Sequence, residues 1–61
     1  LFERAVVVFG GGKEGEDAAR RWFHLPLWAL GEKTPLDYAR TDPGAREIEA
    51  VLDRIDYGVL G

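Results

Sequence analysis

The clearest pattern of apolar and polar positions lies in the last third of the chain, residues 41–61. Its apolar side chains recur every three or four residues, which places them on one face of a helix: Ala45, Ile48, Val51, Leu52 and Ile55. Asp42 precedes Pro43, and because a residue before proline avoids helical angles, we expect Asp42 to be the N-cap. Gly58 is expected to end this helix, against which the rest of the domain would fold.

The first nine residues form a second apolar segment, whose conformation the pattern leaves open. The run 5–9 is uninterrupted and rich in valine, which favours a buried strand. The same segment also has one apolar helical face, made by Phe2, Ala5, Val6 and Phe9. Periodicity alone does not separate strand from helix in so short a run. The three glycines that follow would end either element.

Shorter helical segments are expected between residues 14 and 40. The stretch 14–24 has an apolar face, acidic residues at its start and arginines near its end, as the helix dipole favours. Pro26 should force that helix to finish near residue 24, and Pro26–Leu30 should form a short helical turn closed by Gly31. Thr34 and Pro35 then resemble a capped helix start.

Together these segments predict one small domain over residues 1–61, made of several short helices, about four to five, joined by glycine and proline turns. We expect Trp28 to fill the core rather than to anchor a partner. The core is predicted to hold eight apolar side chains: Ala19, Trp22, Phe23, Leu30, Leu36, Ile48, Leu52 and Ile55.

Composition narrows the possible partners. With 61 residues and no cysteine, the chain has neither disulfides nor thiolate metal sites to stabilise it. A net charge of −3 without a basic stretch argues against direct nucleic-acid contact by this domain. No apolar run approaches the ~20 residues of a membrane span, so a cytoplasmic protein is expected. Because the chain begins at Leu1 rather than methionine, we expect it to be part of a longer protein.

The chain also lacks the residue types that nucleophilic catalysis requires. Serine and cysteine are both absent, which excludes a Ser-His or Cys-His nucleophile within this chain. His24 is the single histidine, and we expect it to be structural or solvated rather than a metal ligand. We therefore predict a binding module rather than an enzyme, with no cofactor.

One glycine motif supports a competing interpretation. Gly10, Gly12 and Gly15 match G-x-G-x-x-G after an apolar run, as in a dinucleotide-binding turn. That interpretation would make the chain a truncated nucleotide-binding fragment of an α/β enzyme, and it requires a strand at Ala5–Phe9. The other interpretation is a glycine-rich turn between helices. A structural oligomerisation domain that self-associates is a further alternative.

The succession of motifs resembles a known family. RAVVVFG, EDAARRWF, LPLWALGEKTPLDYART and DPGAREIEAVLDRIDYGVLG follow one another in the order and spacing of the Xre/MbcA/ParS-type antitoxin, C-terminal toxin-binding domain. The matching segments are Ala5–Gly10, Ala19–Phe23, Ala29–Leu36, Gly44–Leu52 and Arg54–Val59. Departures are mild, with Phe23 for the usual leucine, Ile48 for valine and Asp56 for glutamate.

This resemblance implies more than the composition does. It implies an all-α fold in which Leu1–Phe9 is helical, and a position in the C-terminal part of an antitoxin, often behind a DNA-binding helix-turn-helix region. The implied partner is a RES-domain toxin, an enzyme that consumes NAD. The antitoxin would neutralise this toxin by occluding its NAD pocket.

The end of the chain is our candidate for that contact. An acidic, aromatic and apolar tip after a rigid helix could plug an electropositive pocket, and a tyrosine suits an interface anchor. The predicted partner-binding residues are Arg54, Asp56, Tyr57, Gly58, Val59 and Leu60, with Asp53 beside them. The alternative, in which Tyr57 and Leu60 pack back onto the domain, is equally compatible with the sequence.

Overall fold

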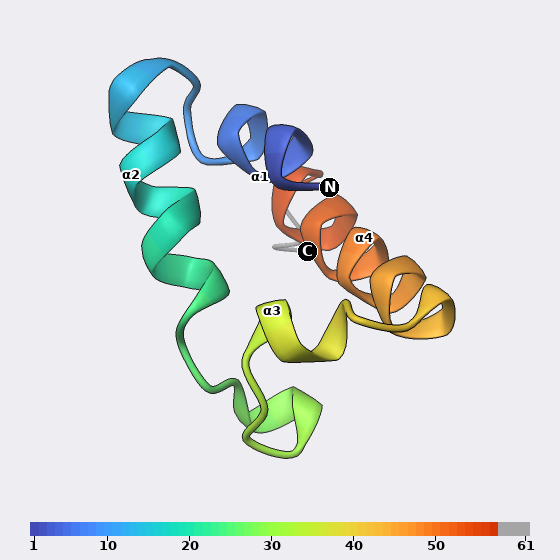
Figure 1. The fold of residues 1–61 in the computed structure, drawn as a ribbon. Helices are drawn as coiled ribbons and strands as arrows, with labels where there is room; N and C mark the ends of the chain where they lie inside the picture. The colour runs from blue at the N-terminus through green and yellow to red at the C-terminus, as the bar shows by residue number, and fades with distance from the viewer. Residues whose placement is uncertain (58–61) are drawn as a thin grey trace.

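The computed structural model describes residues 1–57, and over these residues the architecture is all-α, as predicted (Figure 1). In chain order the elements are α1 (Phe2–Val8), α2 (Gly12–Phe23), a short 3-10 helix η1 (Trp28–Leu30), α3 (Pro35–Tyr38) and α4 (Asp42–Asp56). Helix α1 packs against both α2 and α4, and α3 also contacts both α2 and α4. The radius of gyration, 11.0 Å, is close to the roughly 10.5 Å expected of a compact chain this long.

The glycine motif is a turn between two helices. Residues 2–8 are helical rather than extended, so the strand that a nucleotide-binding fragment requires is absent and that alternative is wrong. Gly10, Gly11 and Gly12 have φ angles of 114°, 72° and 65°, which favour glycine. Gly11 N–H donates to the Val6 carbonyl at 2.8 Å and so ends α1. A Cβ at Gly15 would lie 2.6 Å from that same carbonyl oxygen, so this glycine permits the close approach of α2.

Between α2 and α4 the predicted stops and the Thr34 start are confirmed, but the short helical turn begins at Trp28 rather than at Pro26, because Leu27 is extended. Helix α2 ends at Phe23, as the nearby proline requires. Gly31 closes η1 in the left-handed conformation, and Leu27 N–H donates to the Lys33 carbonyl at 3.1 Å across the loop. Thr34 caps α3, since its Oγ1 accepts a hydrogen bond from the Asp37 N–H at 3.1 Å.

Helix α4 begins differently from our expectation. The N-cap is Thr41, not Asp42, because Thr41 is extended and its Oγ1 accepts the Gly44 N–H at 3.1 Å. Asp42 lies inside the first turn, where its charge suits the helix dipole. Pro43 then occupies the second helical position, where no N–H is needed. The helix ends at Asp56, and the predicted stop at Gly58 lies outside the described residues.

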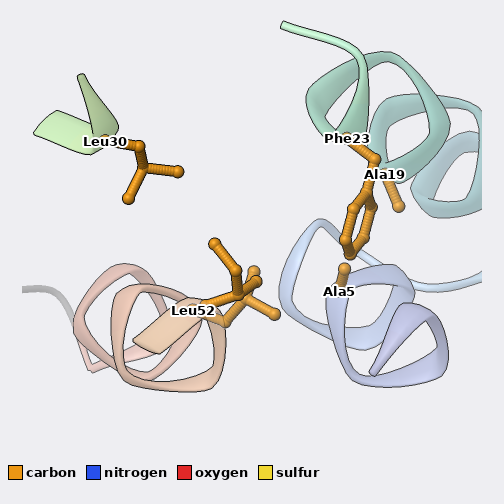
Figure 2. Packing of buried hydrophobic residues seen from close by; sticks show 6 residues of the cluster. Ala5, Ala19, Phe23, Leu30 and Leu52 are labelled. Atoms are coloured by element: carbon orange, nitrogen blue, oxygen red, sulfur yellow. The ribbon is translucent and has the colours of Figure 1, made fainter. Parts of the chain in front are cut away.

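Six side chains from four elements form the core (Figure 2). They are Ala5 from α1, Ala19 and Phe23 from α2, Leu30 from η1, and Ile48 and Leu52 from α4. Five of these confirm the predicted core. Trp22 is half-buried and packs against the cluster, in an edge contact with the Phe23 ring at 5.2 Å between centroids. Ala5 lies on the apolar face noted for residues 2–9 but was not among the eight predicted core residues, because the conformation of that segment was left open.

Three expected core residues lie at the surface instead. Leu36 is 49% exposed and Ile55 is 41% exposed, while Trp28 is 86% exposed and does not fill the core. On α4 the buried positions are Gly44, Ile48 and Leu52, spaced four apart. Leu52 is the last buried residue on this helix among those described, and Ile55, one turn later, lies beyond the buried part of its face. The single turn of α3 buries Pro35 and leaves the adjacent Leu36 outside.

Candidate functional site

The last turn of α4 carries the predicted partner-binding residues that the structure describes. Arg54, Asp56 and Tyr57 are all exposed there, at the end of the helix that lies beside α1 (Figure 1). The other three predicted residues, 58–60, lie outside the described part of the chain. The candidate site can therefore be built from the helix end and its neighbours on α1.

An arginine on α1 connects to this helix end. Arg4 Nη2 lies 2.5 Å from Asp53 Oδ1 and 3.5 Å from Asp56 Oδ2. Every other ion pair among residues 1–57 joins positions three or four apart on one helix or its immediate end. Carboxylates near a helix C-terminus oppose the helix dipole, and the guanidinium of Arg4 offsets that conflict. Both carboxylates could be selected from the sequence, but nothing in it indicates Arg4, which is 49 residues away from Asp53.

Tyr57 projects its ring into solvent. Its backbone N–H donates to the Asp53 carbonyl at 2.9 Å, which ties the residue to the last turn of α4. Its side chain is nevertheless 78% exposed, so the ring does not pack back onto the domain. Ile55, on the same turn, adds a partly exposed aliphatic side chain. An aromatic ring with acidic and aliphatic neighbours is thus presented on a helical support.

Two other apolar surfaces lie away from this helix end. An open groove of about 370 Å³ is lined by apolar and basic side chains: Leu1, Phe2, Phe23, Leu36, Ala39, Arg20, His24 and Arg40. The second is the segment between α2 and α3, which exposes Trp28 of η1 and Leu25. Trp28 was wrongly predicted to be buried, because its position in a turn between a proline and a glycine does not indicate which side chains face the core.

The described residues hold no apparent centre for metal chemistry. Within residues 1–57, no group of three His, Cys, Asp or Glu side chains is placed to bind a metal ion. His24 is exposed, and its Nδ1 lies 2.9 Å from the Arg20 carbonyl oxygen one helical turn earlier, as expected of a structural histidine. None of the helices in this part of the chain is both long and apolar enough to cross a membrane.

Fold and surface place the chain in the class of small all-α domains that expose an acidic and aromatic helix end. The family model described as "Antitoxin Xre/MbcA/ParS C-terminal toxin-binding domain" matches residues 4–58. The chain belongs to this family, as its succession of motifs indicated. The match runs from the third residue of α1 through α4 and reaches one residue beyond the described part.

Curated relatives agree with this assignment. The chain is 32% identical over 60 residues to a protein named Antitoxin Xre from Photorhabdus laumondii. It is also 32% identical over 60 residues to an Antitoxin Xre from Yersinia enterocolitica. Each alignment covers 98% of this chain but 38% of the relative, so the chain spans well under half of their length. No solved structure matches the chain.

Proposed function

We propose that this domain binds a protein toxin and neutralises it, without catalysis of its own. The observation that carries the proposal is the match over residues 4–58 to a family of toxin-binding domains. Two relatives carry the name Antitoxin Xre, which supports the same role. The structure adds a surface suited to it, because Tyr57 is exposed on a supported helix end.

We propose further that the partner is a RES-domain toxin and that the end of α4, with residues 58–60, occludes its NAD pocket. A pocket that holds a pyrophosphate is expected to be electropositive. Asp53 and Asp56 would complement such a pocket, and Tyr57 would supply the large amphipathic side chain that interfaces favour. Since NAD and the tip would then compete for one space, inhibition should be competitive with NAD.

A co-expression experiment tests the partner. The full-length protein that contains this domain would carry a tag and be produced together with the protein encoded beside it. We expect a RES-type enzyme to co-purify and its NAD consumption to appear only after the antitoxin is removed. If nothing co-purifies and the tagged protein only pairs with itself, the oligomerisation alternative replaces this proposal.

Substitutions at Tyr57 test the surface. Tyr57→Ala, alone and with Leu60→Ala, should weaken inhibition, with a loss of 10-fold or more because truncated interface anchors cost about 2 kcal/mol. Tyr57→Phe retains the ring and should retain most of the affinity. Leu25→Ala, at an exposed position on the loop after α2, is the matched control and should leave inhibition unchanged. Full inhibition by the Tyr57→Ala, Leu60→Ala double variant would rule out this tip.

A further inference from the structure

We infer that Arg4 is a positioning residue for the neutralising tip: it holds the last turn of α4 in place through Asp53 and Asp56. This inference rests on the proposed function, since it names the residue that would prepare the tip for its partner. Arg4 belongs to α1, so it would act on the tip from outside α4. The pairing distances of 2.5 Å and 3.5 Å place one guanidinium nitrogen on both carboxylates.

The last turn of α4 needs such an external support. Its two carboxylates stand at the negative end of the helix dipole, where they disfavour the helical conformation. Helix ends fray, and this end buries no side chain after Leu52 within the described residues. Among residues 1–57, the ion pairs that this turn makes with another element are those with Arg4 of α1.

The support matters because Tyr57 has no other side-chain restraint in the part of the chain described. Its ring is exposed, and its backbone N–H bonds to the carbonyl of Asp53, one of the two residues that Arg4 contacts. Ordering a loose segment on binding weakens affinity, whereas a turn ordered beforehand avoids that loss. Arg4 would thus strengthen toxin binding without having to touch the toxin.

The test uses Arg4→Gln in the full-length antitoxin, with two measurements on the same variant. Amide hydrogen exchange should become faster in the last turn of α4, residues 53–57, and stay unchanged in α2. The affinity for the toxin encoded beside it, measured by titrating the toxin's NAD consumption, should fall about three- to fivefold, the range open to a partly exposed ion pair. Arg4→Lys retains the charge and should show smaller changes in both measurements.

The matched control is Arg40→Gln, which removes one exposed arginine that pairs with Asp37 on α3. Its affinity should change by less than about twofold. Three results would overturn the inference. The first is an unchanged toxin affinity of Arg4→Gln while Tyr57→Ala loses affinity. The second is a lower toxin affinity of Arg4→Gln without faster amide exchange in the last turn of α4. The third is a higher toxin affinity of Arg4→Gln. The second would show that Arg4 touches the toxin, and the third that Arg4 competes with the toxin for the carboxylates.

This design separates the two proposals. If Tyr57→Ala and Arg4→Gln both leave inhibition intact, the tip is not the neutralising surface and the proposed function fails at this site. If Tyr57→Ala weakens inhibition and Arg4→Gln leaves it unchanged, the tip is the neutralising surface but Arg4 does not position it.

Discussion

The two parts of α4 show how one helix can serve folding and presentation at once. Over its first three turns the helix is capped by Thr41, and it buries Gly44, Ile48 and Leu52 against the rest of the domain. The last turn, by contrast, buries nothing in the described residues and exposes Tyr57. Side chains hold the first part by packing and by the Thr41 cap, whereas the side-chain contacts of the second part with α1 are surface ion pairs.

The difference has an energetic consequence. Burial of apolar side chains dominates stability, while exposed ion pairs contribute about 0–1 kcal/mol each. The domain can therefore vary the last turn of α4 at little cost to its fold. Substitutions on the buried row should be costly to stability, and those on the tip should be nearly neutral. Four substitutions along or before α4 test this contrast, from the largest expected effect to the smallest.

Leu52→Ala should be the most damaging. Leu52 is fully buried, so its truncation removes apolar contacts and leaves a cavity, at a cost of about 2–5 kcal/mol. In a domain this small, that loss approaches the whole free energy of unfolding. Urea denaturation followed by circular dichroism measures it. Ile55→Ala on the same helix is the control and should cost less than about 1 kcal/mol; equal losses would contradict the division of α4.

Gly44→Ala should come next. A Cβ at this position would clash with the Tyr38 carbonyl oxygen and lie 2.9 Å from Thr41 Oγ1. The gain of about 1 kcal/mol in helix propensity is therefore outweighed, and we expect a net destabilisation of about 1–3 kcal/mol. Thermal unfolding measures the change. Glu47→Ala, at an exposed position of the same helix, should be within about 0.5 kcal/mol of the parent. A stabilised Gly44→Ala variant would show that α3 and α4 do not approach so closely.

Thr41→Ala should cost about 1 kcal/mol. The substitution removes the hydroxyl that accepts the Gly44 N–H and leaves that donor without its cap. Thr41→Ser should restore most of the loss, because serine caps equally well. The measurement also decides between the two candidate caps. A larger loss from Asp42→Ala than from Thr41→Ala would make the aspartate the cap after all.

Tyr57→Ala should have the smallest effect on stability, within about 0.5 kcal/mol. Its exposed ring has few contacts to lose within the domain. The midpoint of urea denaturation checks this directly, with Tyr38→Ala as the comparison, since Tyr38 packs against the core and should be clearly destabilising. A large loss at Tyr57 would mean that this ring supports the fold and is not free to face a partner.

Much of the helical pattern was readable from local chemistry. The proline at 26, the Thr34–Pro35 start and the left-handed Gly31 all fall where backbone geometry requires them. The buried residues Ile48 and Leu52 also followed from their helical spacing. The cap of α4 was misplaced by one residue because Thr41 and Asp42 are both good caps, and only the hydrogen bond to Gly44 distinguishes them.

The candidate site was only half predictable. Its carboxylates and Tyr57 could be selected because they cluster at one helix end. Arg4 could not, because its contact with Asp53 spans nearly the whole chain and depends on α1 lying beside α4. The exposure of Trp28 was missed for a related reason, since an apolar residue in a turn is buried only if another element covers it.

The sequence by itself determined most helix ends to within about two residues, which glycines must turn the chain and, through its succession of motifs, the family to which the chain belongs. These are local properties of backbone angles, caps and spacing. Only the tertiary structure decided that Leu36 and Ile55 lie outside and that Arg4 reaches the end of α4. Burial and long-range pairing depend on which elements meet, and no residue carries that information alone.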